Sequence, residues 1–330
     1  MARLTLTQFG NPAEVITLDT TATPAPGPGQ LLVRMEAATI NDSDFLLIRG
    51  LYPVRPSFPS PVGAEGVGRV VEAGPSTSTD LVGRRVLILP TYEQGTWADE
   101  IVVSENEVVA VDGSADPAQL AMTGINPATA WGLLHRFEQL SPGDWVGQTA
   151  ANGATGLYVI ALAKRLGLRT LNVVRREAAA DAVREAGGEH LVVGGEGIAD
   201  AVSSILGEEK LSLVLDSVGG PVVGELAHAL RFGGKVVSYA VLSGKPPEVS
   251  VFDKIFNEVA ATGFWVINWL RSAPRSEVVD TYGQLAALVA SGELSAPVEA
   301  TYRLEDYRKA FEHAAATERG GKVLFQFGDV

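Results

Sequence analysis

The stretch DWVGQTAANGATGLYVIALAKRLG, residues 144–167, decides the fold. It begins like a buried strand and ends like a helix, and Ala151, Gly153 and Gly156 stand between them at AxGxxG spacing. Such spacing puts residues with little or no side chain where backbone amides can meet a pyrophosphate, at a helix end whose dipole favours negative charge. A tight turn that binds nothing can have the same spacing. The flanking strand and helix favour dinucleotide binding.

The same alternation of strand and helix continues to about residue 271. Strands are predicted at RTLNVV (169–174), HLVV (190–193), LSLVLDSV (211–218) and KVVSYAVL (235–242), with helices at EAAADAVREAGG (177–188) and around 198–206 and 221–231. Repeated strand–helix units imply a parallel sheet covered on both faces, with its ligand site beyond the carboxyl ends of the strands.

Two arginines close the second strand of this unit, in NVVRR (172–176). About twenty residues after such a glycine-rich turn, an acid often holds a ribose hydroxyl. Guanidinium groups would instead pair with a 2′-phosphate through charge-assisted hydrogen bonds. Arg175 and Arg176 therefore predict NADPH as the cofactor in preference to NADH. Alternatively, they only solvate a helix start, where positive charge is mildly unfavourable.

The N-terminal part of the chain has a different pattern of apolar and polar residues. Residues 1–121 hold short alternating runs broken by Gly and Pro: LLVRMEAATI, GVGRVVEAG, RRVLILP and EIVVSENEVVAV. This spacing predicts a compact, mostly antiparallel β domain, with PAPGPG (24–29) as a turn between its first two strands. Two helices and a KVLFQF strand near the C-terminus are expected to return to it. The predicted domains are 1–121 with 272–330, and 122–271.

Composition excludes several classes of protein. The chain has no cysteine and four histidines without metal-ligand spacing, so neither a disulfide nor a metal site is expected. A net charge of −13 argues against binding to nucleic acid or to an anionic membrane. The opening MARLTLTQFG alternates like a strand and is unlike a signal peptide, and no apolar run is long enough to span a bilayer. We expect a soluble, cytoplasmic protein.

The stretch ATINDSDFLLIRGLYPVRPSFPSPVGAEGVGRV, residues 38–70, resembles the medium-chain dehydrogenase/reductase superfamily. Zinc members of that superfamily carry a GHE segment with a ligand histidine, where this chain has Gly63, Ala64 and Glu65, and Asn41 stands in place of their cysteine. The cysteine-rich zinc lobe is missing too. The resemblance implies a zinc-free member with an α/β fold: a GroES-like, mostly antiparallel β catalytic domain and a Rossmann cofactor domain with a doubly wound parallel sheet.

Within the superfamily the chain most resembles the NADPH-dependent 2-enoyl thioester reductases of the mitochondrial fatty-acid synthesis type. Matching segments are INDSDFLLIRGLYP, GTWADEIVV, GINPATAW, FEQLSPGDWV, LGLRTLNVVRR and GFWVINW, with GELSAP and GGKVLF near the C-terminus. The resemblance implies Tyr52, in RGLYP, as the proton donor. Cofactor contacts are implied at Asn126, Asn152, Gly153, Ala154, Thr155, Arg175, Arg176, Tyr239, Ala240, Val241, Leu242, Phe264, Trp265 and Lys322. The YAVL segment departs from the family, which has two glycines after the tyrosine.

The chemistry of enoyl reduction suits a tyrosine. When the β carbon of an unsaturated thioester accepts hydride, charge moves to the enolate oxygen and α carbon, which a nearby hydroxyl can stabilise or protonate. Tyr52 could also be an ordinary half-buried loop tyrosine. Glu65 could orient a substrate, but a structural role as a buried carboxylate, paired with an arginine such as Arg69, is favoured.

Partners are inferred from charge and from the resemblance. Arg49 and Arg55 flank Tyr52 and are candidates to meet the phosphates of coenzyme A or of an acyl carrier protein, and Asn41 is a candidate substrate contact. A solvated loop is the alternative for the arginines. The superfamily also suggests a homodimer formed by edge pairing of the cofactor domains, with the strand near VAATGFWV as the candidate edge.

Two other functions remain open. One is an NADPH-dependent quinone or alkenal reductase of the same zinc-free branch, which would share the glycine-rich turn and the arginines. The other, less favoured, is a cofactor-binding protein that has lost catalysis. An assay of crotonyl-CoA against a panel of quinones separates the first from enoyl thioester reduction, and tight NADPH binding without turnover would indicate the second.

Overall fold

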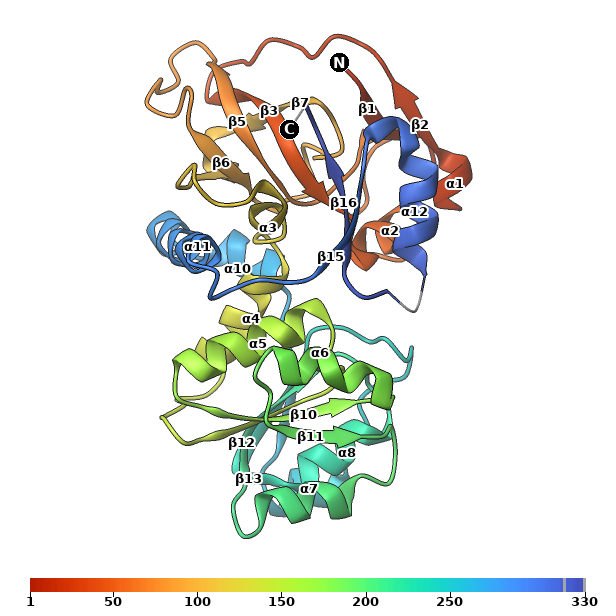
Figure 1. The fold of residues 1–330 in the computed structure, drawn as a ribbon, viewed down its shortest axis with the longest axis vertical. Helices are drawn as coiled ribbons and strands as arrows, with labels where there is room; N and C mark the ends of the chain where they lie inside the picture. The colour runs from red at the N-terminus through yellow and green to blue at the C-terminus, as the bar shows by residue number, and fades with distance from the viewer. Residues whose placement is uncertain (317–318, 329–330) are drawn as a thin grey trace. The chain divides into compact units, whose positions relative to one another are not determined.

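The computed structural model describes residues 1–316 and 319–328 and forms two compact units (Figure 1). The first unit comprises Met1–Ile125 with Ser272–Val330, and the second comprises Asn126–Arg271. The division predicted from the sequence, after residue 121, falls slightly earlier in the chain. Each unit has its own hydrophobic core. Within the described residues, no helix is both long and apolar enough to cross a bilayer.

The first unit is built on a seven-stranded sheet in the order β15-β16-β3-β5-β6-β8, with β7 also paired to β3. All neighbours run antiparallel except β15 and β16. A smaller antiparallel sheet has the order β2-β1-β4. The strands are β1 (Arg3–Leu6), β2 (Ile16–Asp19), β3 (Gln30–Thr39), β4 (Ser60–Pro61), β5 (Gly66–Ala73), β6 (Arg85–Ile88), β7 (Glu100–Ser104), β8 (Val108–Ala110), β15 (Val298–Tyr302) and β16 (Lys322–Gln326).

Alternation along β3 produces the core of this unit. Leu31, Val33 and Met35 are buried in one cluster, as expected for residues two apart on one face of a strand. The fully buried Trp97 contacts the rings of Phe311 and Phe325, which belong to the C-terminal segment. The C-terminal segment therefore completes the core of the first unit.

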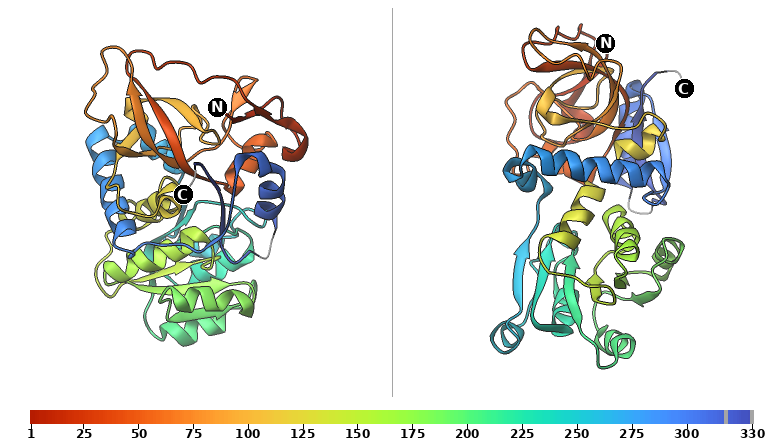
Figure 2. Two further views of the ribbon diagram at one scale, coloured as in Figure 1. Left: turned by 45° about the horizontal axis from the view of Figure 1, so that its top comes forward. Right: turned by 90° about the vertical axis from the view of Figure 1, so that its left-hand side faces the viewer.

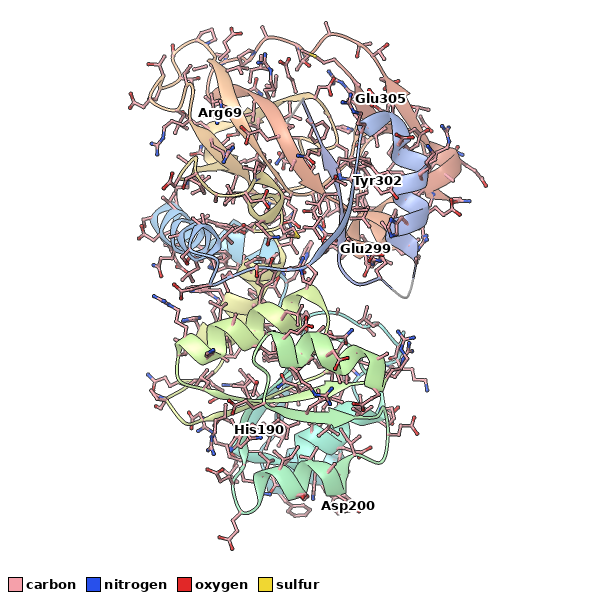
Figure 3. The ribbon with its side chains drawn as sticks, in the orientation of Figure 1. Arg69, His190, Asp200, Glu299, Tyr302 and Glu305 are labelled. Carbon is pink, nitrogen blue, oxygen red and sulfur yellow. The ribbon has the colours of Figure 1, made fainter. Side chains whose placement is uncertain are left out.

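Helices of the first unit are α1 (Pro12–Val15), α2 (Asp42–Ile48), α3 (Pro117–Ala121), α11 (Arg275–Ala290) and α12 (Tyr307–Ala315), with the 3-10 turns η1 (Glu105–Glu107) and η3 (Leu304–Asp306). Polar side-chain contacts connect strand β15 to helix α12. His313 contacts the Tyr302 hydroxyl at 2.9 Å through Nδ1 and Glu299 Oε1 at 3.0 Å through Nε2. Figure 3 labels Tyr302 and Glu299 on β15. This histidine therefore has a structural role.

The second unit has one six-stranded sheet in the order β11-β10-β9-β12-β13-β14, all parallel. This is the 3-2-1-4-5-6 order of a doubly wound dinucleotide-binding sheet. Figure 2 (right) shows β14 at the outer edge. The strands are β9 (Trp145–Gln148), β10 (Arg169–Val174), β11 (His190–Val193), β12 (Leu211–Asp216), β13 (Leu230–Ser238) and β14 (Ala260–Gly263).

Helices pack on both faces of this sheet. Leu171 and Val173 of β10 join a cluster with residues of α7 and α8, whereas Val174 joins a separate cluster with residues of α5 and α6. Successive strand residues point to opposite faces, so the two clusters mark two layers of helices. The helices are α4 (Asn126–His135), α5 (Ala154–Arg165), α6 (Ala180–Glu185), α7 (Ala199–Leu206), α8 (Pro221–His228), α9 (Val251–Phe256) and α10 (Val266–Ser272), with the 3-10 turn η2 (Glu177–Ala179).

Two local predictions are wrong. PAPGPG does not join the first two strands, because α1 and β2 follow β1 and the loop instead leads from β2 to β3. The predicted strand KVVSYAVL ends at Ser238. Beyond that residue the chain turns toward the end of β12, where the backbone N–H of Leu242 donates to the Ser217 carbonyl at 2.9 Å.

Candidate active site

The glycine-rich turn joins β9 to α5 in the second unit. Gly153 is the N-cap of α5 and no side chain caps the helix, so the donors of its first turn remain available to an anion. Gly156 must be glycine, because a Cβ there would lie 2.5 Å from the Ala151 carbonyl oxygen. The turn thus brings α5 close to β9, as a dinucleotide turn requires.

Asn126 lies beside this turn at the start of α4. Its Oδ1 accepts a hydrogen bond from Thr155 Oγ1 at 2.9 Å. Its Nδ2 is buried and has no hydrogen-bond partner among the described residues. A buried donor without a partner is costly, and a ligand oxygen would satisfy it. The open helix end and this unpaired donor fit a dinucleotide.

Arg175 and Arg176 follow β10 directly, and both are exposed. The next acid in the sequence, Glu177, is paired with Arg184, whose Nη2 lies 3.1 Å from Glu177 Oε1. Two guanidinium groups therefore stand at the carboxyl end of the second strand of the sheet, which is where the adenosine ribose lies in this fold class.

The carboxyl ends of β12 and β13 carry an ordered polar group that the sequence analysis missed. Asp216 is fully buried. Its Oδ1 accepts from Thr149 Oγ1 and from the backbone N–H groups of residues 218 and 219, at 2.9–3.0 Å, and its Oδ2 accepts from Ser238 Oγ at 3.0 Å. The aspartate ties together the ends of three strands. The segment DSVGG, residues 216–220, is the sequence feature from which this polar group could have been predicted.

The predicted contacts that follow β13 differ in exposure. Tyr239 is half-buried, and burial raises the pKa of its hydroxyl to about 12. Ala240, Val241 and Leu242 are exposed and lie in the segment that turns toward β12. Their backbone and side chains are therefore accessible to a ligand despite the absence of the glycines that the family has.

The two aromatic candidates after β14 have different surroundings. Phe264 is buried with its ring against Gly132, where an added Cβ would lie 2.3 Å from the ring, and edge-on to Phe137 at 5.7 Å. Trp265 is half-buried, with the Arg271 guanidinium 5.6 Å from its ring centre. The Phe264 side chain is thus occupied by packing, and any ligand contact there would come from its backbone.

A buried polar cluster forms a candidate site of its own in the first unit. Asn41 Nδ2 donates to Glu65 Oε1 at 2.8 Å, and Lys322 Nζ donates to Asn41 Oδ1 at 2.5 Å. Glu65 Oε2 accepts from the backbone N–H of Ile125 at 2.7 Å. The predicted pairing of Glu65 with Arg69 is wrong, since Arg69 Nη2 lies 3.4 Å from Glu36 instead. Asn41 thus takes its orientation from a carboxylate and an ammonium group.

Burial dominates the electrostatics of this cluster. It raises the pKa of Glu65 to about 7, against the opposing effects of Lys322 and of the hydrogen bond from Asn41. It also raises the pKa of Asp44 to about 7, where the charge of Glu65 adds to the effect. The pKa of Lys322 is lowered, and burial is again the largest cause. Glu65 and Asp44 are therefore protonated more readily at neutral pH than ordinary carboxyl groups are.

Tyr52 and its neighbouring arginines lie in the loop after α2. Tyr52 is half-buried against the core of the first unit and its ring centre lies 5.4 Å from that of Tyr92. Arg55 is exposed, donates to the Tyr52 carbonyl at 2.5 Å and covers the Phe9 ring at 5.5 Å. The exposed Arg49 covers the Phe45 ring at 5.8 Å. The guanidinium groups of both arginines make these contacts while their side chains remain exposed.

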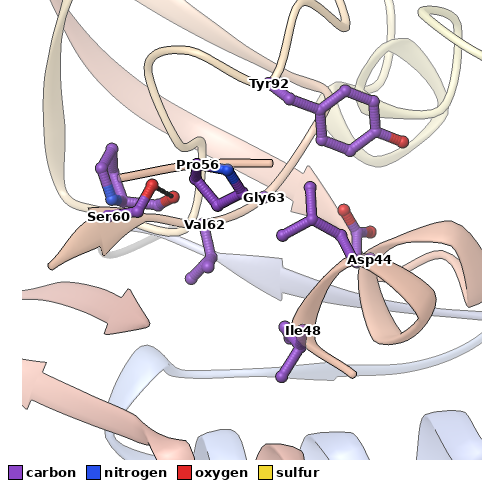
Figure 4. A pocket seen from close by; sticks show the side chains of 9 residues that line it. Asp44, Ile48, Pro56, Ser60, Val62, Gly63 and Tyr92 are labelled. Atoms are coloured by element: carbon purple, nitrogen blue, oxygen red, sulfur yellow. Dashed lines mark hydrogen bonds between the residues drawn. The ribbon is translucent and has the colours of Figure 1, made fainter. Parts of the chain in front are cut away.

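A small pocket adjoins this loop (Figure 4). It is lined from α2 and from residues 56–63, and Tyr92 and Asp44 lie on the same side of it. Its volume of about 10 Å³ corresponds to the space of about one water molecule. The pocket is too small for a substrate, and Tyr92 was not among the residues predicted from the sequence.

Metal ligands do not gather in the part of the chain that the structure describes. Across residues 1–316 and 319–328, no group of three or more His, Cys, Asp and Glu side chains could hold a metal ion. His190 lies on β11 with its ring edge against Trp145, and His228 Nδ1 lies 3.0 Å from Asp253 Oδ1.

Two family models match the chain. Residues 27–113 match the alcohol dehydrogenase GroES-like domain, and residues 154–284 match the zinc-binding dehydrogenase model. The mitochondrial enoyl-[acyl-carrier-protein] reductase of Xenopus tropicalis is 34% identical over 313 residues, which cover 92% of this chain and 89% of that protein.

Solved structures show the same fold. The quinone oxidoreductase of Pseudomonas syringae pv. tomato superposes with a TM-score of 0.87 at 27% identity, over 99% of this chain and 100% of the other. The mitochondrial 2-enoyl thioester reductase heterodimer of Candida tropicalis gives a TM-score of 0.87 at 22% identity, over 99% of each chain.

The fold, the glycine-rich turn and these matches define an oxidoreductase of the medium-chain dehydrogenase/reductase class, which uses a nicotinamide cofactor. The chain belongs to the zinc-free branch of that family, with the enoyl reductases and quinone oxidoreductase-like proteins. The predicted family and fold class are confirmed. The roles predicted for individual residues stay predictions.

Proposed function

We propose that this protein uses NADPH to reduce the C=C bond of a 2-enoyl thioester, carried by coenzyme A or by an acyl carrier protein. The observation that carries the proposal is the 34% identity, over 92% of the chain, to a protein named as an enoyl-[acyl-carrier-protein] reductase. Tyr52, assigned by resemblance, and the arginines Arg175 and Arg176 support it further, because a hydroxyl and a guanidinium pair suit this chemistry and this cofactor.

NADPH would be held by the second unit through the turn at Asn152, Gly153, Ala154 and Thr155, by Asn126, by Arg175 and Arg176, and by the backbone of residues 239–242, 264 and 265. When bound, the cofactor supplies the hydride that adds to the β carbon. The arginines pair with the 2′-phosphate, and the Asn126 amide donates to an acceptor on the cofactor. Lys322, assigned by resemblance, is a further contact from the first unit.

Tyr52 supplies the proton. As charge moves onto the thioester oxygen and α carbon, the Tyr52 O–H bond breaks and a C–H bond forms at the α carbon, with water as the alternative donor. Asn41, oriented by Glu65 and Lys322, offers its amide to the substrate. Arg49 and Arg55 give an otherwise acidic chain a local basic patch for the phosphates of the carrier.

The test is a spectrophotometric screen of NADPH oxidation over crotonyl-CoA, longer enoyl-CoA substrates and a quinone panel. We expect turnover of the thioesters, and a loss of about a hundredfold or more in kcat for Tyr52→Phe, since general acid catalysis contributes roughly that much. Tyr307→Phe is the control, because the Tyr307 hydroxyl is buried and donates to the Ile16 carbonyl at 3.1 Å, in the core of the first unit. Full activity of Tyr52→Phe would show that the proton comes from water.

A quinone or alkenal reductase is the second candidate, favoured by the 27% identity to the quinone oxidoreductase of Pseudomonas syringae. Turnover of quinones but of no enoyl thioester would establish it. A protein that binds NADPH tightly and reduces none of these acceptors would be the non-catalytic alternative.

We also propose a homodimer formed through β14. Among the described residues, β14 pairs only with β13 and all of its residues are exposed. The preceding helix, α9, exposes Val251, Phe252, Ile255 and Phe256. Such an apolar patch beside an open strand edge is typical of a protein interface. The cytoplasmic location stays a prediction.

A further inference from the structure

Tyr92 stands directly against the proposed proton donor. It lies in the loop after β6, and its ring is tilted by 52° to that of Tyr52 with 5.4 Å between the centres. Its φ of +64° is in the left-handed region, which a bulky residue seldom adopts. Costly backbone conformations of this kind cluster at functional sites.

The Tyr92 hydroxyl has two hydroxyl-bearing neighbours. It donates to Ser43 Oγ at 3.1 Å, and the Tyr52 ring lies against its own ring, close enough for the Tyr52 side chain to affect the pKa of Tyr92. Hydroxyl groups can donate or accept by rotating, so the Tyr92 O–H can turn from Ser43 toward Tyr52. Asp44, which lines the same pocket, is the charged group that faces Tyr92 (Figure 4).

We propose that Tyr92 is a positioning residue for Tyr52, holding its hydroxyl and donating a hydrogen bond to the phenolate that remains after the proton has been given to substrate. The inference rests on the proposed function. It concerns this chain's own loop TYEQ, residues 91–94, whose tyrosine takes no part in the motifs that assigned Tyr52.

The proton step is balanced without a further reagent. The O–H bond of Tyr52 breaks, its electron pair stays on the oxygen, and a C–H bond forms at the α carbon. Tyr92 then turns its O–H to the Tyr52 oxygen, and Ser43 donates to Tyr92 in its place. Solvent water later returns a proton to Tyr52. The hydroxyl groups of Tyr92 and Ser43 thus reorient so that their hydrogen atoms point toward the negatively charged Tyr52 oxygen.

Tyr92 suits this role because it keeps its own proton. Burial raises the pKa of its hydroxyl well above the ordinary value of 10.0, and the charge of Asp44 raises it further. The Tyr92 hydroxyl therefore holds its proton more firmly than an ordinary tyrosine does, so it can stabilise negative charge on Tyr52 as a neutral donor.

The test is a double-mutant cycle of Tyr92→Phe and Tyr52→Phe, with kcat and KM measured for crotonyl-CoA across pH. A hydrogen bond to a charged oxygen is lost, so we expect Tyr92→Phe to lower kcat about tenfold with KM unchanged, and to raise the pH of the alkaline limb of kcat. In the Tyr52→Phe background the same change should have no effect. Ser43→Ala should lower kcat by about threefold in the same way.

Tyr307→Phe again serves as the control, since it removes one hydroxyl hydrogen bond of the same unit and should leave kcat unchanged. The inference would be overturned if both Tyr92→Phe and Ser43→Ala kept the wild-type kcat and the wild-type pH profile. It would also be overturned if Tyr92→Phe lowered kcat by the same factor in the wild type and in Tyr52→Phe. If Tyr92→Phe does not fold, Ser43→Ala decides by the same criteria. Wild-type protein inactive on every enoyl thioester would instead refute the proposed function, and this inference with it.

Discussion

At the scale of single residues, polar contacts decide what each candidate can do. Glu65 accepts from the Asn41 amide nitrogen and Lys322 donates to its oxygen, so the amide is held on both sides. Asn41 is therefore an oriented hydrogen-bonding group. Arg175 and Arg176 are exposed at a strand end, and the role that we propose for them is to pair with a phosphate of the cofactor.

Replacing both arginines should change the choice of cofactor. Arg175→Ser with Arg176→Ser would remove two charge-assisted hydrogen bonds, each worth about 1.5–3 kcal/mol, so KM for NADPH should rise by about a hundredfold or more while KM for NADH stays constant. Steady-state kinetics with both cofactors would show this. Arg184→Ser is the matched control, because Arg184 pairs with Glu177 and Asp181 on the same segment. If the double variant still preferred NADPH over NADH, the two arginines could not be the reason for assigning NADPH as the cofactor.

Asp44 should make stability depend on pH. Its pKa is about 7 in the folded protein and 3.8 in the absence of structure, so between those values the folded state binds the extra proton. Stability is then lost as pH rises from about 4 to about 7, by about 1.4 kcal/mol per pH unit for one proton. Asp44→Asn keeps an acceptor for the backbone N–H of Asn41 and removes this titration.

Urea unfolding of the wild type and of Asp44→Asn at several pH values tests this. The advantage of the variant in free energy of unfolding should grow between pH 4 and pH 7 and then level off. Asp306→Asn, at a surface site paired with Lys309, should run parallel to the wild type. Parallel curves for Asp44→Asn as well would mean that its carboxyl titrates normally.

At the scale of elements, the turn between β9 and α5 depends on one glycine. A Cβ at residue 156 would lie 2.5 Å from the Ala151 carbonyl, so Gly156→Ala must push α5 away from the sheet. Overpacking of this kind costs about 1–3 kcal/mol, and NADPH affinity should fall at least several-fold. Thermal unfolding and fluorescence titration with NADPH measure the two effects.

Gly283→Ala provides the contrast. Gly283 is exposed in the middle of α11 and a Cβ there would meet nothing within 4 Å. Alanine favours a helix over glycine by about 1 kcal/mol, so this variant should be more stable and bind NADPH unchanged. Equal behaviour of the two variants would contradict the steric account of the turn.

Local pattern made much of this predictable. The strand–turn–helix at 144–167 and the arginines after β10 follow from periodicity and from a motif within one short stretch. The cluster of Asn41, Glu65 and Lys322 could not be derived that way, since its members are far apart in the sequence and only the folded sheet brings them together. The partner chosen for Glu65 was wrong for the same reason. The helix at NPAEV was missed although Asn11 and Pro12 are a cap and a first-turn proline.

At the scale of the whole molecule, an open sheet edge and an apolar helix face call for a partner. Phe252 and Phe256 of α9 are 68% and 66% exposed and stack on each other at 5.9 Å, immediately before the edge strand β14. Leaving large aromatic side chains in water is unfavourable, and a second copy would cover them while extending the sheet.

Charge at these positions should therefore dissociate the homodimer that we propose. Phe252→Glu with Phe256→Glu buries charge on association, and the dimer should weaken at least tenfold, since aromatic residues at the centre of an interface commonly contribute about 2 kcal/mol or more. Light scattering across a concentration series would report the change. Val82→Glu is the control, because Val82 is also an exposed apolar residue but lies in a loop of the first unit, and its dimer should match the wild type. A wild-type monomer at all concentrations, or a double variant that still dimerises, would mean that this face meets something other than a second copy.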